Sequence, residues 1–244
     1  MITADQPQCF GDHLIAALSS KSDGTVLDKT LGIHHPAIIA NRKRFCALAG
    51  SDYAHVVYQR ILYNHEQTYD VLREVTYRDT TRYMPEIKAD GLITRERGVG
   101  LLLPVADCAA TIVYDPKLHI VALLHLGRHS SLTSLIAKTI RAFAGFGSHR
   151  TDLIVWMAPS VQQSHYQLDY FDPADGEEWY EFVDKRDGKY FVDLQGHNAA
   201  VFEREGLSPH NIHRSSINTA ARGEYFSHSQ GDTSQRFAVL VQLI

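Results

Sequence analysis

Cysteine is scarce in this 244-residue chain, which contains only Cys9, Cys46 and Cys108. An odd and sparse set of cysteines excludes a small secreted scaffold held together by disulfides. Isolated cysteines persist as thiols in a reducing compartment, so we expect a cytoplasmic protein. The first residues also lack the basic start and apolar stretch of a signal peptide, which agrees with that expectation.

Long apolar runs and an excess of one charge sign are missing too. No stretch approaches the roughly 18 apolar residues of a membrane helix. The net charge is −4 and the longest basic cluster is Arg42-Lys43-Arg44, so no basic face typical of nucleic-acid binding is evident. We therefore expect a small-molecule partner, with neither nucleic acid nor membrane involved; the sequence leaves the oligomeric state open.

No internal repeat or Pro/Gly/Ser-rich linker divides the chain, and a single α/β domain over residues 1–244 can fill this length. The apolar runs 101–114 and 120–124 flank a turn signal at Asp115-Pro116, which predicts adjacent buried strands. Helical spacing of apolar residues over 132–143, followed by strand formers at 153–157, predicts a βαβ unit. The class is α/β with a mixed sheet.

The last third of the chain continues this pattern. Residues 193–205 are predicted to be helical, with Gly206 ending the helix. Residues 211–217 and 236–244 are predicted to be strands. The acidic stretch 170–190 is interpreted as a loop with a short surface helix.

Two residues that can carry chemistry fall at the ends of predicted strands. Cys108 lies in Val105-Ala-Asp-Cys108, and His125 lies just before a predicted helix N-terminus. Ligands and catalytic groups gather at such places in α/β sheets. The alternative is that each is an ordinary core residue, because a buried cysteine is often a small apolar side chain. His65 can supply a third ligand, although it is one of 14 histidines and no CxxC or HExxH spacing supports it.

Several short motifs, taken in order, resemble the bacterial YfiH family, known as multicopper polyphenol oxidase or laccase-domain proteins and as purine nucleoside phosphorylases. They span nearly the whole chain. The matching segments are Ala16 to Gly24, Asn41-Arg42, Ala89-Asp-Gly-Leu-Ile-Thr94, Gly98-Val-Gly100, Val105-Ala-Asp-Cys108, Leu124-His-Leu-Gly127, Ala158-Pro-Ser-Val161 with Tyr166, Tyr225-Phe-Ser-His228 and Thr233-Ser-Gln-Arg236. The resemblance implies a single domain in which mixed sheets form a layered sandwich flanked by helices.

The resemblance also implies a metal site. The family's ligands map onto His65, Cys108 and His125, and all three residue types are present. Two imidazoles and one thiolate suit zinc, with copper as the alternative, and three protein ligands leave a fourth position open. Copper ranks lower because the histidines are not arranged in His-x-His pairs as a multicopper oxidase would require.

The surroundings of these ligands depart from the family pattern. Around His65, Tyr63 replaces the family's Gln and Glu66 replaces its Gly. After His125, Arg128-His129-Ser130 stands where the family has Trp-Arg-Gly. Elsewhere, Ile217-Asn218 replaces Cys-Thr and Lys21 replaces Arg. The acid–base candidates are Asp107, Glu66 and His129. The candidates for binding substrate or phosphate are Lys21, Arg42, Arg128 and Arg236, although Arg42 is equally consistent with an exposed helix charge.

The implied activity is phosphorolysis of purine nucleosides, together with deamination of adenosine, which needs a water nucleophile at C6 of the base. Three alternatives stay open. One is a metal-dependent amidase that edits peptidoglycan precursors, and another is a laccase-type polyphenol oxidase. The third is a nucleoside-binding homologue that has lost activity, which the replaced Trp-Arg-Gly and Cys-Thr motifs would favour.

Overall fold

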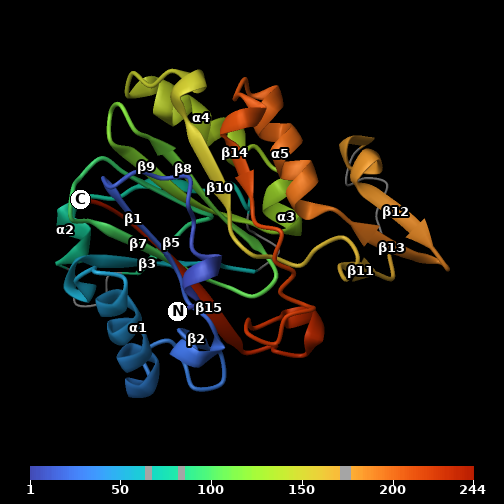
Figure 1. Ribbon diagram of the computed structural model, residues 1–244, viewed down its shortest axis with the longest axis horizontal. Helices are drawn as coiled ribbons and strands as arrows, with labels where there is room; N and C mark the ends of the chain where they lie inside the picture. The colour runs from blue at the N-terminus through green and yellow to red at the C-terminus, as the bar shows by residue number, and fades with distance from the viewer. Residues whose placement is uncertain (64–67, 82–85, 171–176) are drawn as a thin grey trace.

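The computed structural model describes residues 1–63, 68–81, 86–170 and 177–244. In this part of the chain the strands form two large mixed sheets and one small sheet (Figure 1). The first sheet has the order β1 (Leu14–Leu18), β15 (Gln235–Leu243), β7 (Gly100–Val105), β3 (Val56–Arg60) and β5 (Glu86–Lys88), with β2 (Leu27–Asp28) paired to the start of β15. The second sheet has the order β14 (Ile212–Arg214), β10 (Ile154–Met157), β8 (Ala109–Asp115), β9 (Ile120–Leu126), β6 (Gly91–Thr94) and β4 (Leu72–Glu74).

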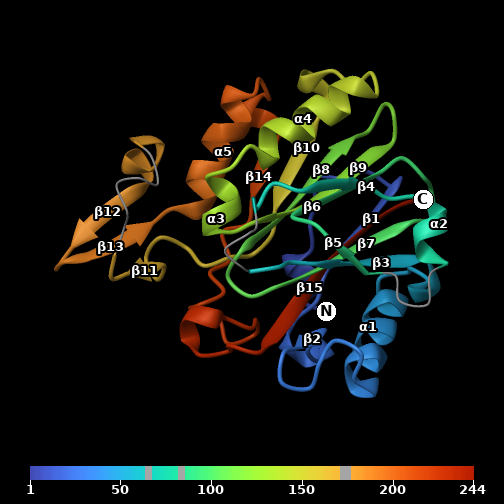
Figure 2. The same ribbon diagram turned by 180° about the vertical axis from the view of Figure 1, so that it is seen from behind.

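The two large sheets stack face to face, and helices cover their outer faces (Figures 1 and 2). Helix α1 lies on the first sheet, and α4 and α5 lie on the second. The α-helices are α1 (Pro36–Leu48), α2 (Tyr77–Thr80), α3 (Arg128–Ser131), α4 (Leu135–Gly145) and α5 (Leu194–Arg204). The 3₁₀ turns are η1 (Thr3–Asp5), η2 (Lys21–Asp23), η3 (Tyr53–His55), η4 (Arg150–Asp152), η6 (Glu177–Phe182), η7 (Pro209–Asn211) and η8 (His228–Gln230). The predicted α/β layered sandwich is confirmed.

The sequence of the central strands explains this layering. Side chains alternate between the two faces of a strand, so a strand covered on both faces must be apolar at every position. In β7, Leu101 and Leu103 pack between the two sheets, whereas Leu102 packs toward α1. In β9, Leu123 points between the sheets and Leu124 points toward α4. The near-continuous apolar runs therefore reflect burial on both faces.

The predicted apolar run 101–114 is divided between the two sheets. Residues Gly100–Val105 form β7 of the first sheet, and Ala109–Asp115 form β8 of the second. β8 pairs antiparallel with β9, as the turn signal predicts. The three residues between β7 and β8 carry the chain from one sheet to the other, and Asp107 there has φ of +77°. A non-glycine residue is uncommon in this left-handed region, so the crossing needs outside support.

The predicted βαβ unit is also present. β9 and β10 each pair antiparallel with β8, so they run parallel to one another with β8 between them. The crossing helix α4 begins at Leu135, later than the predicted start at residue 132, because the short helix α3 occupies Arg128–Ser131 first.

The stretch 170–190 differs from its prediction. η6 matches the short helix, but a β-hairpin of β12 (Val183–Arg186) and β13 (Lys189–Val192) follows it in place of a loop, and β11 (Gln167–Leu168) pairs with β13. The turn residues Asp187 and Gly188 both have positive φ, 49° and 76°. This is the conformation that an Asp-Gly hairpin turn requires. The Asp187-Gly188 turn is a hairpin signal, but the charged residues on the two strands lack the apolar alternation that would predict strands there.

The ends of the chain agree better with the sequence. Helix α5 has Asp193 as its N-cap, and β15 places a core strand at residues 235–243. β14 is shorter than the predicted strand 211–217. No helix in the described ranges has the length and apolar character needed to cross a bilayer.

His197 on α5 packs against η6, the 3₁₀ turn that precedes the hairpin of β12 and β13. Its ring stacks on Trp179 of η6, with centroids 3.8 Å apart and planes 8° from parallel. The side chain is only 1% exposed, and neither ring nitrogen has a hydrogen-bond partner in the described part of the chain. Burial, with a smaller contribution from the charge of Arg204, lowers the pKa of His197 to about 4.

We expect this histidine to make folding stability sensitive to acid. Because the pKa is lower in the folded state, its full contribution is present above the unfolded value of roughly 6.5 and is lost as the pH falls toward 4. His197→Phe should reduce this loss by about 1–3 kcal/mol, measured by urea unfolding between pH 7 and 4. The exposed His210→Phe is the control, and an unchanged pH profile for His197→Phe would contradict the prediction.

Candidate functional site

The turn between β7 and β8 is held by residues from the last third of the chain. The carboxylate of Asp107 accepts hydrogen bonds from Thr219 Oγ1, Ser229 N and Ser229 Oγ, each at 2.7 Å. Its carbonyl oxygen accepts the backbone N–H of Val161 at 3.0 Å. These bonds support the left-handed backbone of Asp107 and thereby fix the position of Cys108, the next residue.

His125 is fixed equally firmly near the end of β9. Its N–H donates to the carbonyl of Asp90 at 2.8 Å, and its own carbonyl accepts the hydroxyl of Ser130 at 2.7 Å. The imidazole Nε2 lies 3.3 Å from the hydroxyl of Tyr63. The side chain is 3% exposed, and its Nδ1 has no hydrogen-bond partner among the described residues. His125 is therefore an ordered, buried imidazole with an unsatisfied ring nitrogen.

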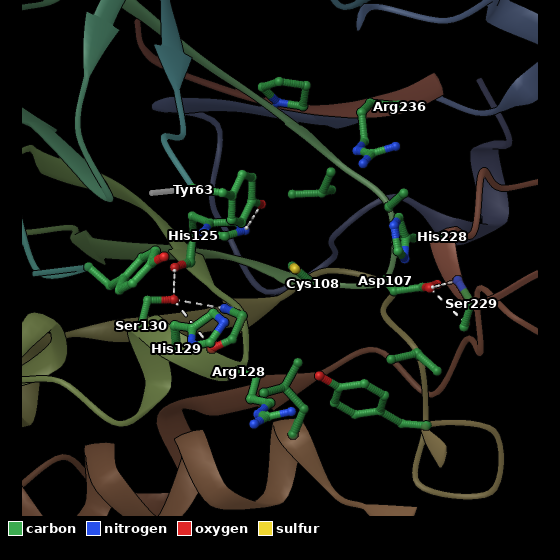
Figure 3. Close-up of a pocket in the computed structure, with 18 of the residues that line it drawn as sticks. Tyr63, Asp107, Cys108, His125, Arg128, His129, Ser130, His228, Ser229 and Arg236 are labelled. Carbon is green, nitrogen blue, oxygen red and sulfur yellow. Dashed lines mark hydrogen bonds between the residues drawn. The ribbon is translucent and has the colours of Figure 1, made fainter. Parts of the chain in front are cut away.

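Cys108 and His125 face a common space. Their strands are adjacent, with Ala110 opposite His125 in the register of β8 and β9. A Cβ placed on Gly127 would lie 2.9 Å from Cys108 Sγ and 3.5 Å from His125 Nε2. Glycine at position 127 therefore keeps open the space that the thiol and the imidazole share (Figure 3).

Burial sets the protonation of both groups. It raises the pKa of Cys108 to about 12, with a further contribution from the negative charge of Asp107. It lowers the pKa of His125 to about 4, and the nearby Arg236 and His129 lower it further. At neutral pH the pair is a thiol and a neutral imidazole, and a bound cation would favour the thiolate, the form in which cysteine ligates metals.

The donor types fit a transition-metal ion, and the ring nitrogen of His125 that borders the shared space is Nε2, which also faces the Tyr63 hydroxyl. Cys108 and His125 supply one sulfur and one nitrogen to the shared space. His65, the third predicted ligand, and Glu66, a predicted acid–base residue, lie outside the described residues. Within the described residues, no group of three or more His, Cys, Asp or Glu side chains is placed to hold a metal. The described residues thus offer two candidate metal donors, Cys108 and His125.

The pair opens into a cavity of about 430 Å³, a volume typical of small-molecule sites. Its lining brings together residues from both large sheets and from the loop before β15. The polar and aromatic lining residues are Lys29, Tyr63, Tyr69, Asp107, Cys108, His125, Arg128, His129, Ser130, Tyr166, His228, Ser229 and Arg236. Cationic and aromatic side chains dominate, and Asp107 is the only carboxylate among these residues. The cavity is therefore suited to an anionic or aromatic ligand.

Several predicted residues line this cavity. Arg128 and His129 reach it from α3, and the His129 ring stacks on Tyr69 with centroids 4.9 Å apart. Arg236 reaches it from β15, with its guanidinium directed toward the cavity (Figure 3). Asp107 borders the cavity, but its carboxylate oxygens already accept the three hydrogen bonds described above.

Lys21 and Arg42 do not line the cavity. The ammonium of Lys21 pairs with Asp232 at 2.9 Å. Arg42 is 4% exposed, its Nε donates to the carbonyl of Val26 at 2.7 Å, and its guanidinium lies 4.0 Å from the ring centroid of Tyr58. Both cations therefore have structural contacts, because α1 and η2 pack on the outer side of the first sheet.

Sequence reasoning did not single out Lys29, Tyr69, His228 or Ser229 as site residues, although all four line the cavity. Lys29 belongs to no motif. His228 stands within Tyr225-Phe-Ser-His228, which carries the family resemblance but suggests no role for that histidine. Only the folded structure reveals His228, because Ser229 binds Asp107 and thereby brings the adjacent His228 to the cavity.

The protein is thus an α/β sandwich with a thiol and an imidazole in the wall of a cationic cavity. Comparison with known proteins assigns its family. Residues 25–244 match the family described as multi-copper polyphenol oxidoreductase laccase, and the chain belongs to that family. The predicted resemblance is thereby confirmed.

Relatives and solved structures agree with this assignment. A protein from Streptomyces griseus named purine nucleoside phosphorylase is 25% identical over 89% of this chain and 86% of its own length. One from Campylobacter jejuni with the same name is 25% identical over 85% of each chain. The crystal structure of a Neisseria meningitidis protein covers 98% of this chain and 97% of its own, with a TM-score of 0.78 and 18% identity. That of Bacillus licheniformis YfiH covers 95% and 93%, with a TM-score of 0.76 and 22% identity.

We expect Gly127→Ala to damage the shared space without unfolding the protein. The new methyl group would lie 2.9 Å from Cys108 Sγ, so the thiol or the imidazole must shift. Metal affinity should fall roughly 10-fold or more, measured by competition with a chelator. Gly145→Ala is the matched control because its Cβ would meet nothing within 4 Å. Equal metal affinity in the two variants would contradict the prediction.

Proposed function

We propose that this protein is a metal-dependent purine nucleoside phosphorylase. The observation that carries the proposal is the cationic, tyrosine-lined cavity built directly against the Cys108–His125 pair. Phosphorolysis needs a site for an anionic nucleophile beside a site for an aromatic base, and this cavity offers both kinds of side chain. The names of the relatives from Streptomyces griseus and Campylobacter jejuni support the same substrate class.

The metal in this proposal is zinc, with copper as the alternative that the family's description suggests. His65, Cys108 and His125 would hold it. A bound zinc ion would supply Lewis acidity toward an oxygen ligand at its open position. The remaining chemistry falls to the residues of the cavity.

In this proposal the cationic residues of the cavity would bind phosphate, and its aromatic residues would contact the purine base. Arg236 and Arg128 would bind phosphate, because guanidinium groups match its oxygens two at a time. A phosphate oxygen would attack C1′ of the ribose as the bond from C1′ to the purine nitrogen breaks. The departing purine then takes a proton, and His129, which lines the cavity, would provide it. Tyr69 and Tyr166 offer aromatic surfaces for the base.

Deamination of adenosine is the second reaction expected of the family, and the bonding of Asp107 makes it the weaker proposal. A deaminase needs a carboxylate that can carry a proton beside the base. Asp107 has both oxygens committed to Thr219 and Ser229, so we propose a positioning role for it. Glu66, the other candidate carboxylate, lies outside the described residues.

The main test compares turnover and metal content in the same preparations. Purified protein should contain about one zinc per chain and should convert inosine and phosphate to hypoxanthine and ribose 1-phosphate. Cys108→Ser should lose both the metal and the turnover, because a hydroxyl is a poor zinc ligand at neutral pH. Cys46→Ser, at a buried position in α1, is the control. The proposal would be refuted if the metal-loaded protein turned over no purine nucleoside, or if it cleaved an amide substrate and no nucleoside.

The role of Asp107 can be tested separately. Asp107→Asn keeps one oxygen acceptor but loses the charge-assisted hydrogen bonds, each worth about 1.5–3 kcal/mol. As a positioning residue, Asp107 should show weaker metal binding in this variant, with activity largely restored by excess metal. Elemental analysis and kinetics at increasing zinc would measure both. A general base would instead lose kcat at full metal content, which would contradict the positioning role.

A further inference from the structure

The candidate cavity is joined to a second cavity by a shared wall. The second cavity has a volume of about 480 Å³ and lies on the side of α1 and β3. The residues that line both cavities are Lys29, Tyr63, Pro104 and Arg236. Two of these four carry a positive charge, so the wall that the cavities share is itself cationic.

Arg236 brings a buried charge to this wall without an ion-pair partner among the described residues. It is 8% exposed, and its Nη1 donates to the carbonyl oxygens of Asp232 and Gln235 at 3.1 and 2.6 Å. The nearby carboxylate of Asp232 is already bound to Lys21 and to the N–H of Ser227. Buried charges are normally paired, so a guanidinium that faces a cavity in this way is suited to an external anion.

Lys29 faces the same wall from the turn after β2. Its backbone is anchored by an N–H bond to the carbonyl of Ser234, two residues before Arg236. Its ammonium lies 5.6 Å from the ring centroid of Tyr63, and in the described part of the chain it forms no ion pair. Lys29 is an exposed residue, and partial desolvation together with the charge of Arg236 lowers its pKa. Because Lys29 and Arg236 line both cavities, the two cations share one wall.

We propose that Lys29 and Arg236 form a subsite for a tetrahedral oxyanion, either free phosphate or a phosphate group carried by the substrate. An anion between them would replace their mutual repulsion with two attractive contacts. The guanidinium offers a planar pair of donors, and the ammonium adds a compact point charge. The assignment of free phosphate rests on the proposed function, whereas the subsite itself rests on the two cations and the shared wall.

This subsite explains how the chain could bind phosphate although two of the predicted phosphate-binding residues are engaged elsewhere. Lys21 and Arg42 are held by structural contacts outside the cavity. Lys29 lies in none of the segments that resemble the family, so it would be a binding residue that those segments do not indicate. Together with Arg236, it would position the anion at the edge of the candidate site.

The experiment is a calorimetric titration of the metal-loaded protein with inorganic phosphate at low ionic strength. Lys29→Gln should weaken phosphate binding roughly 10-fold to 100-fold, the range expected for one charged hydrogen bond. Lys29→Arg should restore most of the affinity. Lys88→Gln, which removes the same charge from an exposed position on β5, should bind phosphate like the parent protein.

Thermal unfolding in the absence of phosphate separates binding from a structural role. Lys29→Gln should unfold at the same temperature as the parent protein or a higher one, because it removes the repulsion with Arg236. A lower unfolding temperature combined with weaker binding would overturn the proposal, since Lys29 would then be needed for the fold. Equal phosphate affinity in Lys29→Gln and Lys88→Gln would also overturn it.

A parallel titration with inosine and with inosine 5′-monophosphate identifies the source of the anion. If inosine 5′-monophosphate competes with phosphate and inosine does not, the subsite is supported and the substrate is a phosphorylated one. Phosphate that binds together with inosine supports the subsite and indicates a free co-substrate. If neither phosphate nor the nucleotide binds in a manner that depends on Lys29, the subsite is refuted. Binding without turnover would leave the subsite intact while refuting the phosphorylase.

Discussion

The chain crosses from the first sheet to the second through Ala106, Asp107 and Cys108, and the candidate site depends on how this crossing is held. The left-handed backbone of Asp107 is costly for a residue with a side chain. Bonds to Thr219 and Ser229 compensate for that cost, and they come from segments more than 100 positions later. The same bonds that stabilise the crossing also place Cys108 beside His125 and draw the loop with His228 to the cavity.

This arrangement explains why so much of the fold could be predicted from the sequence. The double-sided burial of β7, β8, β9 and β15 appears directly as continuous apolar runs, and helix α5 is marked by Asp193 at its start. Cys108 and His125 could be chosen because strand ends are visible in such patterns. The hairpin of β12 and β13 could not be found in this way, since its charged strands lack the apolar alternation that marks a half-buried strand.

The remaining parts of the site depend on contacts between distant segments, which no local pattern records. Arg42 matches a family motif and Lys21 replaces a family arginine, yet packing of Arg42 against Tyr58 and pairing of Lys21 with Asp232 give each of them another contact. Lys29 matches no motif and nevertheless lies on the wall of the cavity. Whether a cation faces a ligand thus depends on whether another part of the chain already engages it, and those contacts exist only in the folded protein.

The place of β15 in the first sheet has a consequence for how the protein is made. This strand lies between β1 and β7, and it is translated after both of them. Until it leaves the ribosome, the facing edges of β1 and β7 have no partner, and exposed strand edges favour aggregation. Arg236 and the loop that supports Asp107 emerge with it. The sheet and its cavity would therefore be completed together, after the other strands of the sheet have been made.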